Sequence, residues 1–184
     1  MPRQPDPYVE ARILDAAQHL VHKDGENALS MRKVAAAAGT NTPALYRRFR
    51  NKKEILRALT RRNQQTLFQV LEPCRSLMEL CDSALEFALT HPREYQLLTS
   101  GLASKVTDER PNIEFAMQRS ADWLGGQPKD HMRLVLALFA LLHGTAMLLS
   151  SKSLSEEYET GMRHAYKSAA ESLIAEAERP SRCT

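Results

Sequence analysis

The sequence predicts an all-α protein, and three observations support that class. Apolar residues recur at helical spacing through most of the 184 residues. Glycine and proline fall between these segments, where they end or begin helices. No segment shows the alternating pattern of a strand together with a turn partner. We therefore expect about nine helices, and a hydrophobic content of 43% is sufficient to build a buried core.

The first two predicted helices are separated by a glycine-containing turn. The first covers residues 8–23, and Gly25 follows it, where a residue in the left-handed conformation would end the helix. Ser30 is expected to cap a second helix that continues through Ala38, and Gly39 ends it. The apolar face of the first helix consists of Val9, Ile13, Ala16, Ala17 and Leu20.

The third predicted helix is short and begins at Asn41 or Thr42. Pro43 is tolerated in its first turn because the missing amide hydrogen would have no helical partner there. A long fourth helix begins at Asn51 and continues to about residue 70. The Asn51 side chain and the Glu54 carboxylate are expected to satisfy each other's free backbone amides in a capping box.

Five further helices are expected in the rest of the chain. Pro73 and Pro92 mark helix boundaries, and residues 108–111 and 125–128 form loops. The expected ranges are 74–90, 92–103, 111–124, 128–151 and 154–178.

The segment from Met132 to Leu149 is apolar over most of its helical circumference. A helix of this kind must be buried on all sides. A second copy of the protein that covers one face would provide this burial. We expect the last two helices to pair with their symmetry mates in a four-helix, two-fold interface.

Charge is distributed unevenly along the chain. Residues 1–65 hold 13 Lys and Arg against 6 Asp and Glu, whereas the remaining 119 residues hold 12 against 16. A basic N-terminal region on an acidic remainder predicts that only the N-terminal region contacts a polyanion.

Several function classes lack their signatures. The N-terminus has no apolar signal core, and no stretch approaches the length of uninterrupted apolar residues that a membrane span needs, so we expect a soluble, cytoplasmic protein. No Gly-rich phosphate loop, nucleophile elbow or His-Glu-x-x-His motif occurs, so no enzyme activity and no cofactor are predicted.

The three cysteines do not predict a disulfide framework or a zinc finger, because their number is odd and their spacing fits no metal site. Cys74 and Cys81 are interpreted as small helix-face residues and Cys183 as part of a loose tail. A redox switch is the alternative. Asp15, His19 and His22 share a helix face, but polar residues are expected there and no fourth ligand is placed, so no metal site is predicted.

Residues 30–54 have the layout of a helix-turn-helix. Ala35 is small enough to lie where the two helices cross, Gly39 allows the turn, and Leu45 locks the second helix onto the first. In this motif the second helix lies in the major groove of DNA, with its N-terminal residues toward base edges.

The side chains of this motif suit a DNA surface. Asn41 and Thr42 can hydrogen-bond base edges or phosphate, and Ala44 can contact a thymine methyl. Tyr46, Arg48 and Lys52 can reach the sugar-phosphate backbone. The alternative is that the basic residues form only a solvated surface. Phe49 is expected to fill the core of the three helices, and Tyr46 to pack its ring while its hydroxyl reaches phosphate.

Residues 8–57 resemble the DNA-binding domain of the tetracycline-repressor (TetR) family. The match includes the motif residues above, the apolar run of the first helix, and Leu45, Tyr46, Phe49, Asn51, Lys52 and Glu54 at fixed spacing. The resemblance implies a homodimeric repressor whose C-terminal body binds a small molecule and then releases DNA. It implies DNA contacts at Arg32, Thr42, Pro43, Ala44, Tyr46, Arg48 and Lys52.

Two features depart from the family pattern. Thr40, Asn41 and Thr42 replace the commoner apolar-Ser-x start of the recognition helix, and Arg47 beside Arg48 adds positive charge at its end. The groove placement is therefore expected to hold, whereas the operator sequence is not inherited. We add Asn41 and Arg47 to the predicted DNA contacts.

The C-terminal part is similar to a branch of the family at two short motifs. These are His91-Pro92-x-x-Tyr95 and Leu142-His143-Gly144. His143 is either a hydrogen-bonded core histidine or a polar group facing a ligand cavity. The aromatic and Met side chains of this region can be core or pocket in the same way. The candidate effector-binding residues are Phe87, Tyr95, Phe115, Met117, Trp123 and His143.

These features predict a flexible arm at 1–7, a DNA-binding domain at 8–57 with a linking helix to about 70, an effector-binding and dimerisation domain at 58–178, and a flexible tail at 179–184. We expect a repressor that binds a palindrome with two DNA-binding domains about 34–36 Å apart, or a multiple of that, and is released by a small apolar effector. The alternatives are an effector-independent architectural DNA-binding protein and an all-helical small-molecule carrier.

Overall fold

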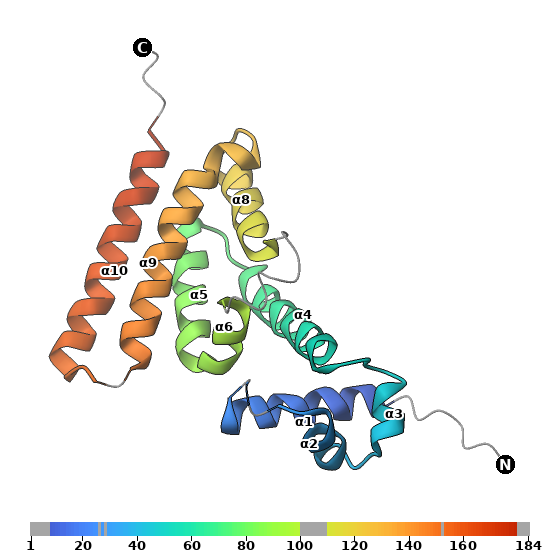
Figure 1. Cartoon of the computed structure of the whole chain (residues 1–184). Coiled ribbons are helices and arrows are strands. Elements are labelled where there is room, and N and C mark those ends of the chain that lie inside the picture. The colour runs from blue at the N-terminus through green and yellow to red at the C-terminus, as the bar shows by residue number, and fades with distance from the viewer. Residues whose placement is uncertain (1–7, 26, 28, 100–109, 152, 180–184) are drawn as a thin grey trace. The chain divides into compact units, whose positions relative to one another are not determined.

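The computed structural model describes residues 8–179 apart from residues 26, 28, 100–109 and 152 (Figure 1). This part of the chain contains nine α-helices, one short 3-10 helix and no strand, which confirms the all-α class. The chain divides into two compact units, the head (residues 1–63) and the body (residues 64–184). The predicted arm at 1–7 and nearly all of the predicted tail at 179–184 lie outside the described residues.

The head contains α1 (Val9–Asp24), α2 (Met31–Ala37), α3 (Thr42–Tyr46) and the first part of α4 (Lys52–Leu71). Each helix contributes a few apolar side chains to one core, so four short segments fold around a common centre. The most deeply buried of these side chains are Ile13, Ala17, Val34, Leu45, Ile55 and Leu59.

Local hydrogen bonds fix the ends of the head helices as the sequence predicts. The Ser30 hydroxyl accepts from the Lys33 amide at 3.3 Å, and Asn41 Oδ1 accepts from the Ala44 amide at 2.8 Å. Each bond satisfies an amide that has no partner within its helix. Gly39 follows α2 with φ +62°, a backbone conformation that residues with a Cβ rarely adopt.

The capping box at the start of α4 differs from its prediction in one bond. The Asn51 side chain accepts from the Glu54 amide at 3.1 Å as expected. The Glu54 carboxylate, however, accepts from the Arg50 amide at 2.7 Å, because its side chain extends back beyond the cap residue. The same pair of bonds starts α5, where Ser76 accepts from the Glu79 amide and the Glu79 carboxylate accepts from the Arg75 amide.

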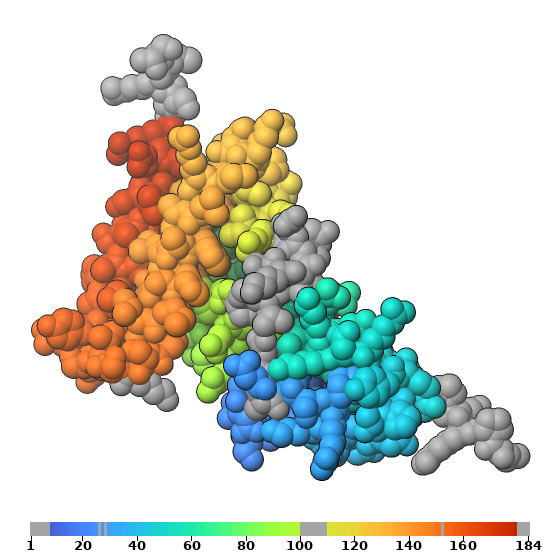
Figure 2. All heavy atoms as spheres, viewed as in Figure 1, coloured from blue at the N-terminus to red at the C-terminus, as the bar shows by residue number. Residues whose placement is uncertain are grey.

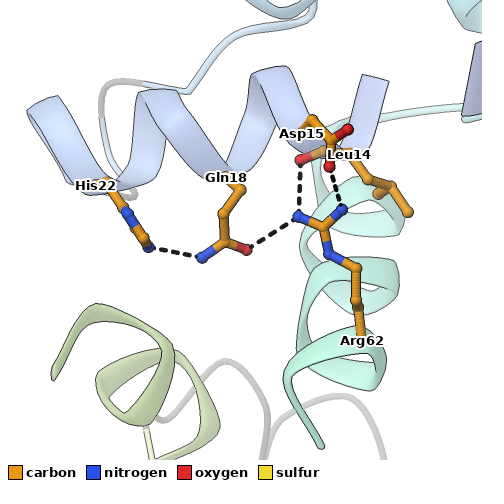
Figure 3. Close-up of polar contacts among 5 residues, drawn as sticks. All are labelled: Leu14, Asp15, Gln18, His22 and Arg62. Atoms are coloured by element: carbon orange, nitrogen blue, oxygen red, sulfur yellow. Dashed lines mark hydrogen bonds and ion pairs between the residues drawn. The ribbon is translucent and has the colours of Figure 1, made fainter. Parts of the chain in front are cut away.

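Arg62 joins α4 to α1 within the head (Figure 3). Its guanidinium donates to Asp15 Oδ1 at 2.6 Å, to the Leu14 carbonyl at 3.4 Å and to Gln18 Oε1 at 3.5 Å. The Gln18 amide nitrogen lies 2.7 Å from the His22 ring. Asp15 and His22 are therefore engaged in hydrogen bonds along α1, and the described residues contain no cluster of potential metal ligands.

The body consists of the end of α4 with α5 (Leu77–Thr90), α6 (Pro92–Thr99), α8 (Pro111–Leu124), η2 (Pro128–His131), α9 (Met132–Ser150) and α10 (Glu156–Ala177). Helix α5 packs against α6, α8, α9 and α10, so it lies at the centre of the unit (Figure 1). The Tyr166 hydroxyl donates to the Cys81 carbonyl at 2.9 Å and joins α10 to α5.

Three predicted helix boundaries in the body need correction or lie partly outside the described residues. Residues 74–76 precede α5 in a loop, so Cys74 is a buried loop residue and not a helix-face residue. The predicted helix at 128–151 begins with a 3-10 turn, where Gln127 and Asp130 form a capping box before α9 starts. The described part of the helix predicted at 92–103 ends at Thr99.

Helix α9 is buried on only one face within a single chain. Val135, Leu138 and Leu142 are buried, whereas Leu136 is 47% and Met147 56% exposed. This exposed apolar face is the one that the second copy predicted from the sequence would cover. Together, η2 and α9 form the one segment in the described ranges that is long and apolar enough to cross a membrane by length and composition.

Candidate functional site

The crossing of α2 and α3 gives the head the geometry of a helix-turn-helix. Ala35 and Leu45 are buried in the core at 3% and 0% exposure, and the turn between their helices contains Gly39 with its positive φ. Phe49 is also buried, as expected for a residue that fills the core. These apolar contacts hold α3 in place and leave its other side chains for the surface.

The residues predicted to contact DNA surround α3 and the start of α4. Six of them are exposed and three are half-buried, so all nine have some access to solvent. Half of the Tyr46 surface is exposed, which is more than a packed ring would show. The exposed residues are Arg32, Asn41, Pro43, Tyr46, Arg47 and Arg48, and the half-buried ones are Thr42, Ala44 and Lys52.

The surroundings of these residues are strongly basic. Residues 29–63 hold ten Lys or Arg and a single acidic residue, Glu54, whose carboxylate is bonded to a backbone amide. Arg48 has a distant ion pair with Glu10, with 3.9 Å between the charged atoms, and an exposed pair of this length is weak. Apart from Arg62, which pairs with Asp15, the positive charge of this stretch is therefore largely uncompensated in the described residues.

Asn41 has two chemical groups with different tasks. Its Oδ1 is occupied by the amide of Ala44 in the cap of α3. The side-chain nitrogen is therefore the group that suits a base edge or a phosphate. The cap thus decides which part of Asn41 is available to DNA.

The body contains an apolar cavity of about 80 Å³. Side chains from α4, α5, α6, α8 and α9 form its walls, and among the described lining residues none is Asp, Glu, Lys, Arg or His. The end of α4 contributes Leu67 and Leu71 to the wall. The helix that begins in the head thus ends at the cavity.

Of the six candidate effector-binding residues, Tyr95 alone lines this cavity. Phe87 is buried and its ring stacks on His91 at 4.9 Å, and Phe115 stacks on Phe68 at 5.0 Å. Trp123 lies beneath the Arg119 guanidinium, with 4.5 Å to the ring centre. Met117 is half-buried and does not line the cavity.

His143 acts as a partner of a cavity residue and does not line the cavity itself. Its Nδ1 lies 3.2 Å from the Tyr95 hydroxyl, and its ring stacks on Phe139 at 6.0 Å. This arrangement matches the hydrogen-bonded histidine, which is one of the two interpretations that the sequence allows.

Burial makes the weakly acidic groups of Cys81 and Tyr95 in the cavity wall still harder to ionise. It raises the pKa of the Cys81 thiol to about 12 and the pKa of the Tyr95 phenol above its usual range. Both groups are therefore neutral near and well above pH 7.

Most of the cavity residues give no signal in the sequence because they are Leu, Ile, Val and Ala. These residue types fill cores everywhere, so their pattern does not distinguish a wall from a core. Asn112, in the first turn of α8, is the one described lining residue with a side-chain amide. Its position does not single it out in the sequence, because Asn is common at helix starts.

The turn that follows α4 is held to α8, which forms another wall of the cavity. Arg119 donates to the carbonyl of Cys74 at 2.6 Å and to the carbonyl of Glu72 at 3.4 Å. The stack of Phe68 on Phe115 joins α4 itself to α8. A change in the position of α8 would therefore also move the end of α4.

Comparisons with known proteins agree with this architecture. A model of bacterial regulatory proteins of the tetR family matches residues 13–59, and a model of the tetracyclin repressor-like C-terminal domain matches residues 77–173. None of the curated proteins compared matches the chain.

Solved structures share the fold at low sequence identity. A TetR variant from Acinetobacter baumannii AYE, solved in complex with minocycline, has 22% identity and a TM-score of 0.66, with 96% of this chain and 98% of that chain covered. A TetR-family transcriptional regulator from Streptomyces coelicolor has 22% identity and a TM-score of 0.69, with 92% and 99% covered.

The two family models together span the helix-turn-helix of the head and most of the body, and the helix order follows the same plan as these structures. The chain therefore belongs to the TetR family of transcriptional regulators.

Proposed function

We propose that the protein is a cytoplasmic, homodimeric repressor that leaves a palindromic operator when a small apolar effector binds its body. The single observation that carries this proposal is the course of α4. This helix starts with Lys52 beside the basic surface of the head and ends with Leu67 and Leu71 in the cavity wall. One continuous helix thus belongs to both the proposed DNA site and the proposed effector site.

On DNA, α3 would occupy the major groove. The Asn41 side-chain nitrogen and Thr42 would contact base edges or phosphate, and Ala44 would contact a thymine methyl. Tyr46, Arg47, Arg48, Lys52 and Arg32 would contact the sugar-phosphate backbone, with Pro43 positioned at the start of the helix. The uncompensated charge around these residues supports this assignment.

Two copies would associate through α9 and α10. The exposed face of α9 is apolar, with Leu136, Phe139 and Met147 at helical spacing. Beside it, α10 exposes the small residues Gly161 and Ala165, which would allow close approach of a symmetry mate. Figure 2 shows both helices at the surface of the body. A two-fold interface would cover this apolar face.

Release would be a shift between two populations of the dimer. In one, the two heads match successive major grooves; in the other, they do not. An effector that fits the cavity better in the second state favours it by the ratio of its affinities for the two states. The minocycline complex of the Acinetobacter protein shows that a protein of this fold binds a small molecule, which supports an effector site here.

The experiment that tests the proposal is selection of bound sequences from random duplex DNA at about 150 mM salt, where exposed charges more than a Debye length apart are largely screened. We expect enrichment of a palindrome. A folded dimer that enriches no sequence would overturn the proposal and favour an architectural protein or a carrier.

A further inference from the structure

We infer that Arg119 fixes the direction of α4 in the body and thereby sets the distance between half-sites that the dimer accepts. The inference rests on the proposed function, because it concerns how two copies match one palindrome. It is carried by the contacts of Arg119 with the turn after α4 and by the continuity of that helix. In this role Arg119 is a positioning residue, which acts on DNA binding through α4.

Arg119 holds the turn at the carboxyl end of α4. Its Nη2 donates to the Cys74 carbonyl at 2.6 Å and to the Glu72 carbonyl at 3.4 Å. The carboxyl end of a helix carries partial negative charge, so a guanidinium is favoured there. A hydrogen bond from a charged donor also contributes more than a bond between neutral groups. Arg119 therefore fastens this end more firmly than a neutral side chain would.

The guanidinium of Arg119 is itself held in place. Its central carbon lies 4.5 Å from the centre of the Trp123 ring, which supports one face of the planar group. The ion pair with Asp122 is long, with 3.9 Å between the charged atoms, and contributes little. The two carbonyls of the turn are therefore the main polar partners of this side chain.

Two weaker contacts join the same region to its neighbours. The Cys74 thiol lies 3.5 Å from Ser83 Oγ on α5, and the Phe68 ring stacks on Phe115 at 5.0 Å. A thiol is a weak donor, and an aromatic pair tolerates a range of offsets. Arg119 is therefore the contact that defines the position of the turn.

A small change at this end of α4 reaches the head because α4 is one helix. It has 20 residues and contains neither Gly nor Pro, the usual causes of a kink. At 1.5 Å per residue such a helix is about 30 Å long, so a tilt of about 4° moves its far end by about 2 Å. Opposite tilts in two copies are then comparable with the rise of about 3.4 Å of one base pair.

The spacing of the half-sites provides the test. We would measure binding to the palindrome that the wild type enriches, to the same palindrome with one base pair inserted or removed at its centre, and to a duplex with a single half-site. The wild type should bind the two altered spacings at least about tenfold more weakly than the original, as a fixed distance between two heads predicts.

Arg119→Met removes the donors and keeps an unbranched apolar side chain. Without the hold on the turn, α4 populates more directions, so the penalty for an altered spacing should fall below about threefold. Affinity for the original palindrome should fall about fivefold, because a smaller fraction of the dimers has the matching spacing. Affinity for the single half-site should not change.

Tyr166→Phe is the matched control. The Tyr166 hydroxyl also donates to a main-chain carbonyl of the body, that of Cys81 at 2.9 Å, but it joins α10 to α5 and does not contact α4. This variant should keep the spacing penalty of the wild type. If Arg119→Met unfolds, Arg119→Lys gives the same comparison, since Lys keeps the charge but lacks the planar fork, and its spacing penalty should lie below that of the wild type.

Four results would overturn the inference: a wild type that binds all spacings equally, an unchanged spacing penalty in the Arg119 variants, a half-site affinity that falls as much as the palindrome affinity, or an equal relaxation in Tyr166→Phe. The proposed function fails at an earlier step, when the wild type enriches no palindrome, and that result would overturn this inference with it.

Discussion

The head and the body differ in the polar contacts within each unit, namely in how far apart in the sequence the two partners lie. In the head, the caps join residues three or four positions apart, as in Ser30 to Lys33 and Asn41 to Ala44. The body has caps of the same kind, such as Ser76 with Glu79, but its helices are also joined by the Tyr95 hydroxyl to His143, 48 residues away, and by the Tyr166 hydroxyl to Cys81, 85 residues away. Local sequence therefore specifies much of the head, whereas the body depends on how distant helices pack.

This difference suits the two roles that we propose, DNA binding for the head and effector binding for the body. A DNA-binding surface requires a fixed arrangement of a few side chains, and short-range caps provide it. An effector site requires walls that respond to an occupant, and walls contributed by several helices can shift relative to one another. The following predictions test whether the two units respond as separately as this comparison implies.

The largest effect is expected for Leu45→Ala in the head. Leu45 is fully buried, and truncation of such a side chain costs about 2–5 kcal/mol of folding stability. Hydrogen exchange should show loss of protection in α1 to α3 and no change in α9 and α10. DNA affinity should be lost, while association of the two copies through the body should remain.

Val70→Ala is the control for this truncation, because Val70 is 40% exposed and should lose less than about 1 kcal/mol. If Leu45→Ala reduced protection in the body as much as in the head, the two units would fold as one and the comparison would be wrong.

The second prediction concerns the apolar face of α9. Leu136→Lys places one charge from each copy in the proposed two-fold interface, where it would be desolvated without a partner. We expect the dimer dissociation constant to rise at least 100-fold in sedimentation equilibrium, equivalent to about 3 kcal/mol. The fold of the body should not change, because Leu136 is 47% exposed in one chain.

Gln118→Lys on α8 adds the same charge at another exposed position and should not affect association. An unchanged dimer in the Leu136 variant would place the interface elsewhere on the body.

The third prediction concerns the basic surface. Arg48→Ala should weaken operator binding about tenfold, and each phosphate that the protein no longer contacts should reduce the slope of log affinity against log salt by about 0.9. Association of the two copies should remain intact. The measurement is a salt series of DNA titrations with the selected operator.

Arg93→Ala, in the exposed first turn of α6, is the matched control for removal of one positive charge. Equal slopes for the Arg48 variant and the wild type would remove Arg48 from the proposed contacts.

The contrast between short-range contacts in the head and long-range contacts in the body also explains which features could be predicted from the sequence. Caps, Gly39 and the core positions Ala35, Leu45 and Phe49 have local signatures, and the structure confirms these elements. The cavity could not be predicted in this way. Its wall consists mainly of apolar side chains from five helices, and a Leu in a wall has the same local pattern as a Leu in a core.

The aromatic candidates other than Tyr95 do not line the cavity for a related reason. Large apolar side chains fill cores and also line pockets, which is why Phe87, Phe115 and Trp123 are candidates from the sequence. In the structure each of them has a ring or guanidinium partner nearby, so its surface is used in packing. Tyr95 differs because its hydroxyl finds a partner in a distant helix, and that hydrogen bond depends on the assembled fold.

The smallest effect is expected for a contact in the head whose two partners lie far apart in the sequence. The Arg62 to Asp15 pair joins residues 47 positions apart, but 70% of the Asp15 side chain is exposed. Exposed ion pairs contribute about 0.2–1 kcal/mol, so a double-mutant cycle with Arg62→Ala and Asp15→Ala should give a coupling energy in that range. High salt should reduce it.

The longer Glu10 to Arg48 pair is the comparison for this cycle and should show less coupling, because its charged atoms are 3.9 Å apart. A coupling energy above about 2 kcal/mol for Arg62 and Asp15 would exceed what an exposed pair provides. The hydrogen bond from Arg62 to the Leu14 carbonyl does not enter this coupling energy, because Arg62→Ala removes it in both backgrounds and it cancels in the cycle. The head would in that case depend on a long-range interaction as the body does, and the connection of α1 to α4 would be a route by which motion of α4 reaches the DNA surface.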